Sequence, residues 1–205
     1  MTEKKQPDGR HPTTADGLTA ARLRQNLRCG ISRLGEVFAK ADLSGAVRLV
    51  DLLTHAPTVF LAGAGRSGLV ARCLAMRLMQ LGKNVHVAGD TVAPAITRED
   101  MLLILTGSGE TAGLAVLAEK AAQNGAFVAA VTAHPAAGIP GRANLTVKIP
   151  IEDDAKAVEP PPGVHPLGSL FEQAAFLFLE AVVVELMDRL GQTQADMRRR
   201  HANLE

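Results

Sequence analysis

The alternation of short apolar runs with longer amphipathic segments between residues 58 and 149 most strongly limits what this chain can fold into. Short, almost continuously apolar runs are typical of strands buried on both faces of a parallel sheet, and the segments between them have the spacing of connecting helices. The sequence therefore predicts an α/β fold with a doubly wound, five-stranded, mainly parallel sheet flanked by helices. The predicted strands are Thr58–Ala62, Asn84–Ala88, Met101–Thr106, Phe127–Thr132 and Leu145–Ile149.

Amphipathic helices are predicted before, between and after these strands. From Leu18 to Phe38 the apolar residues step by three and four, and a second helix is predicted to begin near Asp42 or Ser44 and to end before His55. Two later helices each close on a glycine, which is a common C-terminal residue of a helix. These two and the last helix are predicted at Gly68–Leu81, Thr111–Asn124 and Ser169–Leu190.

The chain is predicted to form one domain with a tail at each end. Its 205 residues suit a single hydrophobic core. Residues 1–15 are polar and rich in proline, glycine and threonine, so we expect a disordered tail there. The domain is expected over residues 16–190, with a connecting loop at the proline-rich stretch 159–166, and residues 191–205 are expected to form a short charged tail.

Charge and composition exclude several functional classes. The 22 basic and 21 acidic side chains nearly cancel and only 3% of the residues are aromatic, so binding of nucleic acid is not expected. No stretch has the roughly 18 to 20 uncharged apolar residues of a membrane span. Cys29 and Cys73 lack metal-binding spacing, so we expect a reduced, cytoplasmic protein with no metal and no other cofactor.

A glycine-rich turn follows the first predicted strand and reads Gly63-Ala64-Gly65-Arg66-Ser67-Gly68. Glycines let the backbone approach an oxyanion closely, and the first amides of the following helix point outward with the positive end of its dipole. The spacing also fits the fingerprint of dinucleotide-binding proteins, in which an acidic residue binds ribose, and Asp90 lies near that position. A nucleotide site therefore stays open from this turn alone.

A second turn of the same kind follows the third predicted strand and reads Thr106-Gly107-Ser108-Gly109-Glu110-Thr111. Either turn alone would also fit an ordinary helix cap. Two turns with hydroxyl side chains at neighbouring strand ends favour a phosphomonoester, whose oxygens accept several hydrogen bonds. Neither turn reads as a P-loop with its lysine, which disfavours hydrolysis of a nucleoside triphosphate. The sequence therefore predicts a site for a small phosphorylated molecule.

Five motifs give the chain a resemblance to a known family: Gly65–Gly68, Ala75–Gly82, Gly107–Thr111, Pro166–Gln173 and Arg200–Glu205. With them the chain resembles, from about Leu23 to its end, the SIS family of sugar-phosphate isomerases and sugar-phosphate-binding domains, and within it the group that acts on hexulose phosphates. The resemblance implies a single SIS domain with a flavodoxin-like sandwich, assembled into a dimer or a tetramer. The last predicted helix is apolar on more than one face, which also favours packing between subunits.

The resemblance also implies an activity. Members of this group interconvert D-arabino-3-hexulose 6-phosphate and fructose 6-phosphate through a 2,3-enediolate, in the ribulose monophosphate pathway that assimilates or detoxifies formaldehyde. In the family the two glycine-rich turns hold the substrate phosphate, and the glutamate that matches Glu172 is the catalytic base. The substrate-binding residues implied here are Gly65, Arg66, Ser67, Thr106, Gly107, Ser108, Gly109, Glu110 and Thr111.

Three residues are candidates for proton transfer. Glu172 is the first, although Ser169-x-x-Glu172 also has the spacing of a capping box, in which the glutamate bonds back to the helix start. Glu110 is the second candidate for the base. His201, in the charged tail, becomes a candidate through the resemblance, as a carrier of protons between the two sugar oxygens.

Two other functions stay open from the sequence. One is a different SIS isomerase that acts on an arabinose or sedoheptulose phosphate, although that group often carries extra domains or metal-site histidines, and the sequence shows neither. The other is a sugar-phosphate sensor without turnover. Such regulators usually add a helix-turn-helix domain, for which residues 1–55 are too short and too neutral.

Overall fold

The computed structural model of the chain describes residues 20–151 and 169–204, so the tail predicted at 1–15 and the loop predicted at 159–166 lie outside the described residues. Five strands form one sheet in which every pairing is parallel, which confirms the predicted α/β fold. The predicted strands agree with the observed ones to within one residue at each end. The strands are β1 (Thr58–Gly63), β2 (Asn84–Val87), β3 (Met101–Thr106), β4 (Phe127–Thr132) and β5 (Leu145–Lys148).

The order of the strands decides where a ligand can bind. The strands lie in the order β2-β1-β3-β4-β5, so the chain moves from β1 to β2 on one side and then returns to place β3 on the other side of β1. In open α/β sheets the carboxyl ends of two strands at such a reversal leave a crevice for a ligand. Both glycine-rich turns leave the sheet at this crevice, because one follows β1 and the other follows β3.

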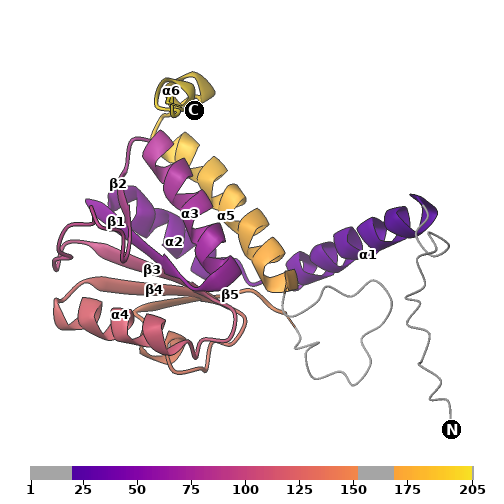
Figure 1. Cartoon of the computed structure of the whole chain (residues 1–205), viewed down its shortest axis with the longest axis horizontal. Coiled ribbons are helices and arrows are strands. Elements are labelled where there is room, and N and C mark those ends of the chain that lie inside the picture. Colours follow the sequence, from indigo (N-terminus) through magenta and orange to yellow (C-terminus); the bar gives the residue numbers. More distant parts are fainter. Residues whose placement is uncertain (1–19, 152–168, 205) are drawn as a thin grey trace, which may run out of the picture.

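The α-helices in the described part of the chain are α1 (Ala20–Ala39), α2 (Ser44–His55), α3 (Gly65–Gln80), α4 (Ala112–Gln123), α5 (Ser169–Arg189) and α6 (Gln194–Arg199). Figure 1 shows α2, α3 and α5 on one face of the sheet and α4 on the other. Helix α1 extends away from the sheet and contacts the body of the molecule at α5. A short 3₁₀ turn, Pro140–Arg142, precedes β5.

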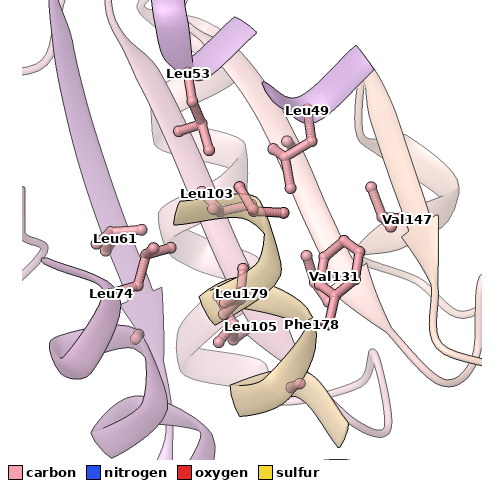
Figure 2. Packing of buried hydrophobic residues seen from close by; sticks show 14 of the residues in the cluster. Leu49, Leu53, Leu61, Leu74, Leu103, Leu105, Val131, Val147, Phe178 and Leu179 are labelled. Atoms are coloured by element: carbon pink, nitrogen blue, oxygen red, sulfur yellow. The ribbon is translucent and has the colours of Figure 1, made fainter. Parts of the chain in front are cut away.

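The larger core lies between the sheet and helices α2, α3 and α5. Alternate residues of a strand point to opposite faces, so Leu61 and Leu103 face these helices while Phe60 and Leu102 face α4. Figure 2 shows Phe178 and Leu179 of α5 among side chains from α2, α3 and four strands. Burying a leucine or phenylalanine of this kind contributes about 1.5–3 kcal/mol. The core therefore fixes α5, whose first turn carries Glu172, against the sheet.

The stretch expected to form a charged C-terminal tail contains a helix, α6. A capping box starts it: the Thr193 hydroxyl accepts a hydrogen bond from the Asp196 amide, and the Asp196 carboxylate accepts one from the Thr193 amide. These two residues satisfy amides that would otherwise be unpaired at a helix start. Met197 packs against the main core and holds α6 to the body of the protein.

Candidate active site

The first loop, residues 63–68, joins β1 to α3 with very close backbone packing. A Cβ atom on Gly68 would lie 2.7 Å from the carbonyl oxygen of Gly63, and one on Gly63 would lie 2.8 Å from the backbone of Ser67. Gly65 has a φ of +56°, which favours glycine. Helix α3 begins at Gly65, three residues earlier than predicted, so Arg66 and Ser67 lie on its first turn.

The first turn of α3 offers unpaired donors to a ligand. The first amides of a helix have no partner within the helix and carry the positive end of its dipole. Ser67 is buried, and its hydroxyl makes no hydrogen bond to another residue in the described ranges. An oxyanion at this turn would therefore meet several donors.

The second loop, residues 106–111, joins β3 to α4 and is held in shape by its own side chains. The buried Thr106 hydroxyl accepts a hydrogen bond from the Gly109 amide at 3.0 Å, and the Ser108 hydroxyl accepts one from the Glu110 amide at 3.3 Å. Gly109 has a φ of +72°, which the turn needs. Thr106 therefore supports the loop, while the exposed Ser108 keeps a hydroxyl proton to donate.

The remaining side chains of the second loop point in different directions. The Glu110 carboxylate accepts a hydrogen bond from the Gly138 amide at 3.1 Å, which turns it toward the segment after β4. The structure therefore does not bring Glu110 together with Glu172. Thr111 lies at the start of α4 without capping it through its side chain, so its hydroxyl stays available to a ligand.

Glu172 pairs with Arg66 across the two helix starts. Arg66 Nε donates a hydrogen bond to Glu172 Oε2 at 2.9 Å; the Glu172 side chain is 16% exposed and the Arg66 side chain 62%. The capping box considered for Ser169 and Glu172 is not formed. Ser169 is buried, and its hydroxyl has no hydrogen-bond partner among residues 20–151 and 169–204. The arginine of α3 competes successfully for the carboxylate that the capping box would use.

The residue before Glu172 connects this carboxylate to the second loop. A Cβ atom on Gly107 would lie 3.1 Å from Cδ1 of Phe171, so any larger residue would press against this ring. Phe171 is 4% exposed and cannot move into solvent. Glu172 is therefore tied to the first loop by Arg66 and to the second loop by its neighbour Phe171.

An open groove of about 480 Å³ begins at Arg66 and Glu172. Gln173 is its third polar lining residue. The rest of its lining consists of apolar side chains from α1, α3 and α5, namely Leu34, Leu69, Val70, Phe176 and Leu177.

Asp90, the acidic residue that kept a nucleotide site possible from the sequence, is paired with an arginine. The two carboxylate oxygens of Asp90 accept hydrogen bonds from Arg72 of α3 at 2.8 and 3.2 Å. These hydrogen bonds hold the pKa of Asp90 below its usual value. A carboxylate paired in this way is not free to bind ribose. Close packing of Gly63 on Gly68 explains the glycine spacing without a nucleotide.

His201 lies far from Glu172 within one chain. The preceding residue, Arg200, donates a hydrogen bond to the carbonyl of Gln80 at the C-terminal end of α3, at 3.0 Å. Arg66 lies at the other end of α3, roughly 20 Å away at 1.5 Å per residue. Figure 1 likewise shows α6 beyond the end of α5, opposite the turn that carries Glu172. The structure therefore does not bring His201 and Glu172 of one chain together.

The two loops, Arg66 and Glu172 are recognisable in the sequence, but the pairing of Arg66 with Glu172 is not. The roles of Phe171 and of the buried Ser169 hydroxyl are not recognisable there either. The signal for both was the stretch Pro166–Gln173, because it contains the start of a long apolar helix and carries the candidate base. Its residues become interpretable only when α5 lies against the second loop.

Residues 52–175 match the SIS domain family, and the chain belongs to this family of proteins. Two of its relatives carry the name of one particular activity within this family. A 3-hexulose-6-phosphate isomerase of Mycobacterium gastri is 40% identical over 209 residues, covering 100% of both chains. One of Bacillus subtilis is 39% identical and covers 78% of this chain and 86% of its own.

A solved structure from Methanococcus jannaschii, for which the function of a 3-hexulose-6-phosphate isomerase was inferred, has the same fold. It aligns with a TM-score of 0.75 and 29% identity, covering 89% of this chain and 99% of the other. The resemblance drawn from the motifs is thereby confirmed at the level of family and fold.

Two kinds of feature are absent from the described residues. No helix among them is long and apolar enough to cross a membrane. They also contain no group of three or more histidine, cysteine, aspartate or glutamate side chains arranged to hold a metal ion.

Proposed function

We propose that the protein is an isomerase that interconverts D-arabino-3-hexulose 6-phosphate and fructose 6-phosphate. Relatives from three bacteria, 37% to 40% identical to this chain, carry the name 3-hexulose-6-phosphate isomerase. The observation that carries the proposal is the position of Glu172. It is a largely buried carboxylate beside Arg66, between two loops with donors for a phosphate.

The two loops bind the phosphate in this proposal. The first-turn amides of α3 and the hydroxyls of Ser67, Ser108 and Thr111 donate to its oxygens. Each hydrogen bond to a charged oxygen contributes about 1.5–3 kcal/mol. Thr106 and Gly109 act indirectly, because they hold the second loop in the shape that presents these donors.

Glu172 transfers the proton. Its carboxylate takes the proton from C2 of the 3-hexulose, a 2,3-enediolate forms, and the same carboxylate returns the proton to C3 to give the 2-ketose. A second proton moves from the C2 oxygen to the C3 oxygen. One carboxylate on one face of the enediolate suffices for both carbon steps.

Arg66 balances the charges of the reaction. Its guanidinium already contacts Glu172 and is largely exposed, so it also reaches an anion at the first loop. The negative charge of the enediolate forms between this guanidinium and the loop amides, which stabilise it electrostatically. Because the phosphate esterifies O6, the 3-hexulose cannot close a furanose ring through that oxygen and enters as an open chain.

We also propose the setting that the substrate implies. A phosphorylated sugar is charged and stays inside the cell, so we expect the protein in the cytoplasm. The reaction is the isomerase step of the ribulose monophosphate pathway, in which formaldehyde is fixed or detoxified.

The experiment that tests the function uses D-arabino-3-hexulose 6-phosphate and follows fructose 6-phosphate formation by purified protein. We expect Glu172→Gln to lower kcat by at least 10²- to 10⁴-fold, because the amide keeps the hydrogen bond from Arg66 but cannot take a proton. Binding of the phosphate should stay close to normal.

Glu180→Gln is the matched control. Glu180 also lies on α5 and also pairs with an arginine of α3, Arg77, at 3.3 Å, but away from both loops. Both variants lose one partly exposed ion pair, so their free energies of unfolding should change by similar amounts, about 1 kcal/mol or less. Only Glu172→Gln should lose activity. Absence of turnover in the native protein, or equal activity in the two variants, would contradict the proposal and favour a sensor.

The protein is proposed to act as a homodimer or homotetramer. Large apolar side chains remain exposed on one stripe of α1 and on the outer faces of α3 and α5, next to the groove at Arg66. An apolar surface of this extent normally packs against another protein surface. These side chains are Leu23, Leu27 and Ile31 of α1, Leu69 and Met76 of α3, and Phe176, Leu177 and Val184 of α5. Light scattering at micromolar concentration should find a dimer or tetramer, and a monomer would refute this assembly.

In such an assembly His201 enters the site of a neighbouring subunit. This role is tested by mixing two inactive variants, His201→Ala and Glu172→Gln, through co-expression. If each site uses Glu172 of one chain and His201 of another, random dimers regain about one quarter of the wild-type activity. No recovery in mixed oligomers would mean that His201 does not act across subunits.

A further inference from the structure

The buried hydroxyl of Ser169 is a polar group that the proposed mechanism leaves unused. Ser169 is 6% exposed and begins α5, and its Oγ atom has no hydrogen-bond partner among residues 20–151 and 169–204. A buried hydroxyl without a partner is unfavourable, and such groups are rare in folded proteins. The protein therefore gains stability in any state in which an acceptor reaches this hydroxyl.

Glu172 is the acceptor that can reach it. Glu172 lies three residues after Ser169 on α5, and side chains at this spacing share one helix face, with Cβ atoms about 5–6 Å apart. Helix side chains also lean toward the helix N-terminus, so the carboxylate leans toward Ser169 when nothing else holds it. In the structure Arg66 of α3 holds it, because Glu172 Oε2 accepts a hydrogen bond from Arg66 Nε at 2.9 Å. Arg66 and Ser169 therefore compete for one carboxylate.

Arg66 is held less firmly than Arg77, the other arginine of α3 that pairs with a glutamate of α5. Arg77 donates to Glu180 at 3.3 Å and also to Gln80 of its own helix at 3.2 Å. Arg66 is 62% exposed and donates to Glu172 through Nε alone, and neither of its terminal nitrogen atoms donates a hydrogen bond within the described part of the chain. A phosphate dianion at the first loop would offer these atoms more negative charge than a carboxylate, in a geometry that accepts two parallel hydrogen bonds.

We propose that Ser169 is a positioning residue for the base: it donates a hydrogen bond to the Glu172 carboxylate after the substrate phosphate has drawn Arg66 to the first loop. The inference rests on the proposed function, because it uses the same phosphate position and the same base. Glu172 then has two partners in turn. Arg66 holds the carboxylate before the phosphate binds, and the buried Ser169 hydroxyl holds it during proton transfer.

The exchange of partners prepares the carboxylate for proton transfer. The Ser169 hydroxyl binds one carboxylate oxygen and fixes the side chain, and the other oxygen stays free to take the proton from carbon. The ion pair with Arg66 instead turns an oxygen toward the guanidinium. Part of the binding energy of the phosphate is thus used to place the base, so the phosphate acts on kcat and not on KM alone.

The variant Ser169→Ala tests this role in solution. It removes a hydroxyl that has no partner in the part of the chain that the structure describes, so the midpoint of thermal unfolding should stay unchanged or rise. With 3-hexulose 6-phosphate as substrate, kcat should fall about 10- to 100-fold while KM changes less than about threefold. The reason for this split is that the carboxylate loses its position while the phosphate keeps its donors.

Ser44→Ala is the matched control, because Ser44 is also the first residue of a helix, α2, but belongs to neither loop. Its hydroxyl donates a hydrogen bond to Asp42 at 3.0 Å in the structure. Ser44→Ala should therefore lose a little stability and keep the kcat of the native protein, which is the opposite pattern. An unchanged kcat in Ser169→Ala, or a loss of stability at least as large as in Ser44→Ala, would overturn the proposal.

A crystal structure of the protein with fructose 6-phosphate tests the exchange of partners directly. We expect Arg66 on the phosphate and the Ser169 Oγ atom about 3 Å from an oxygen of Glu172. Arg66 still on Glu172 with the sugar phosphate bound, or Ser169 bound to a sugar oxygen, would overturn this inference and leave the proposed function intact. Absence of turnover of 3-hexulose 6-phosphate by the native protein would refute the proposed function itself.

Discussion

Replacing Gly107 with alanine adds one methyl group at the contact that joins the second loop to Phe171, the neighbour of the proposed base Glu172. The new Cβ would lie 3.1 Å from Cδ1, 3.4 Å from Cγ and 3.6 Å from Cε1 of the Phe171 ring. Ordinary contacts between carbon atoms begin at about 3.5 Å, so the ring must shift by a few tenths of an ångström. Phe171 is buried in the core and has little space to receive this shift.

The size of the expected losses in stability and in kcat follows from this overlap. Adding a methylene-sized group to a packed core costs about 1–3 kcal/mol of unfolding free energy. The shift of Phe171 is passed to Glu172, and a displacement of 1 Å can cost about 100-fold in rate, so a few tenths should lower kcat by up to roughly tenfold. KM should change little, because alanine keeps the backbone amide of residue 107 in the proposed phosphate-binding loop.

The assay combines thermal unfolding with steady-state kinetics on 3-hexulose 6-phosphate. Gly113→Ala is the matched control, because a Cβ on Gly113 of α4 meets no atom within 4 Å. That variant should keep full activity and gain up to about 1 kcal/mol from better helix propensity. In the double variant Gly107→Ala with Phe171→Leu, the smaller side chain should restore part of the kcat lost in Gly107→Ala alone.

A Gly107→Ala protein with unchanged kcat would refute the claim that Phe171 transmits the position of the loop to Glu172. A loss of kcat that Phe171→Leu fails to relieve would also refute it, because the damage would then arise within the loop. A large rise in KM alone would point to the phosphate contacts instead.

Three further predictions test other parts of the site and fold. Ser67→Ala and Ser108→Ala should each raise KM about ten- to a hundredfold with little change in kcat, because each removes a hydrogen bond to a charged oxygen, and such a bond contributes about 1.5–3 kcal/mol. Unchanged affinity of both variants for fructose 6-phosphate in a titration would refute the two-loop site. Deleting residues 198–205 should remove activity while circular dichroism still shows a folded chain, and a fully active truncated protein would rule out the shared site. Hydrogen bonds from Thr193 hold the pKa of Asp196 below its usual value, so the cap of α6 is intact above about pH 4 and is lost as the pH falls through the lowered pKa. Hydrogen exchange of the α6 amides should accelerate in that acid range, and the Asp196→Asn variant should show fast exchange at neutral pH as well.

The elements of the fold could be predicted from the sequence because their signals are local. The three central strands, β1, β3 and β4, are apolar runs that are almost wholly buried on both faces, and the helices repeat their apolar residues every three or four positions. The start of α3 was predicted three residues late, because the pattern does not reveal that Gly65 adopts a positive φ and enters the helix directly. Helix α6 was missed because its charged composition was read as a tail, although the Thr193 and Asp196 cap is itself a local signal.

The site was predicted as residues but not as an arrangement. The two glycine-rich turns were recognisable, and their meeting at one edge follows from a parallel sheet. For Glu172 the local signal was misleading, since the spacing to Ser169 favoured a capping box that the structure does not contain. The actual partner, Arg66, is 106 positions away in the sequence, and no local pattern reports such a contact.

The amino-acid sequence by itself determined the strands, most of the helices, the two loops and the family. Only the tertiary structure decided that Arg66 holds Glu172, that Phe171 packs against Gly107, and that His201 lies at the far end of α3. The physical reason is the separation along the sequence over which each kind of signal acts. Helix and strand signals arise from neighbours a few residues apart, whereas the site depends on the order of the strands and on how the buried face of α5 packs on the sheet, which the whole core sets at once.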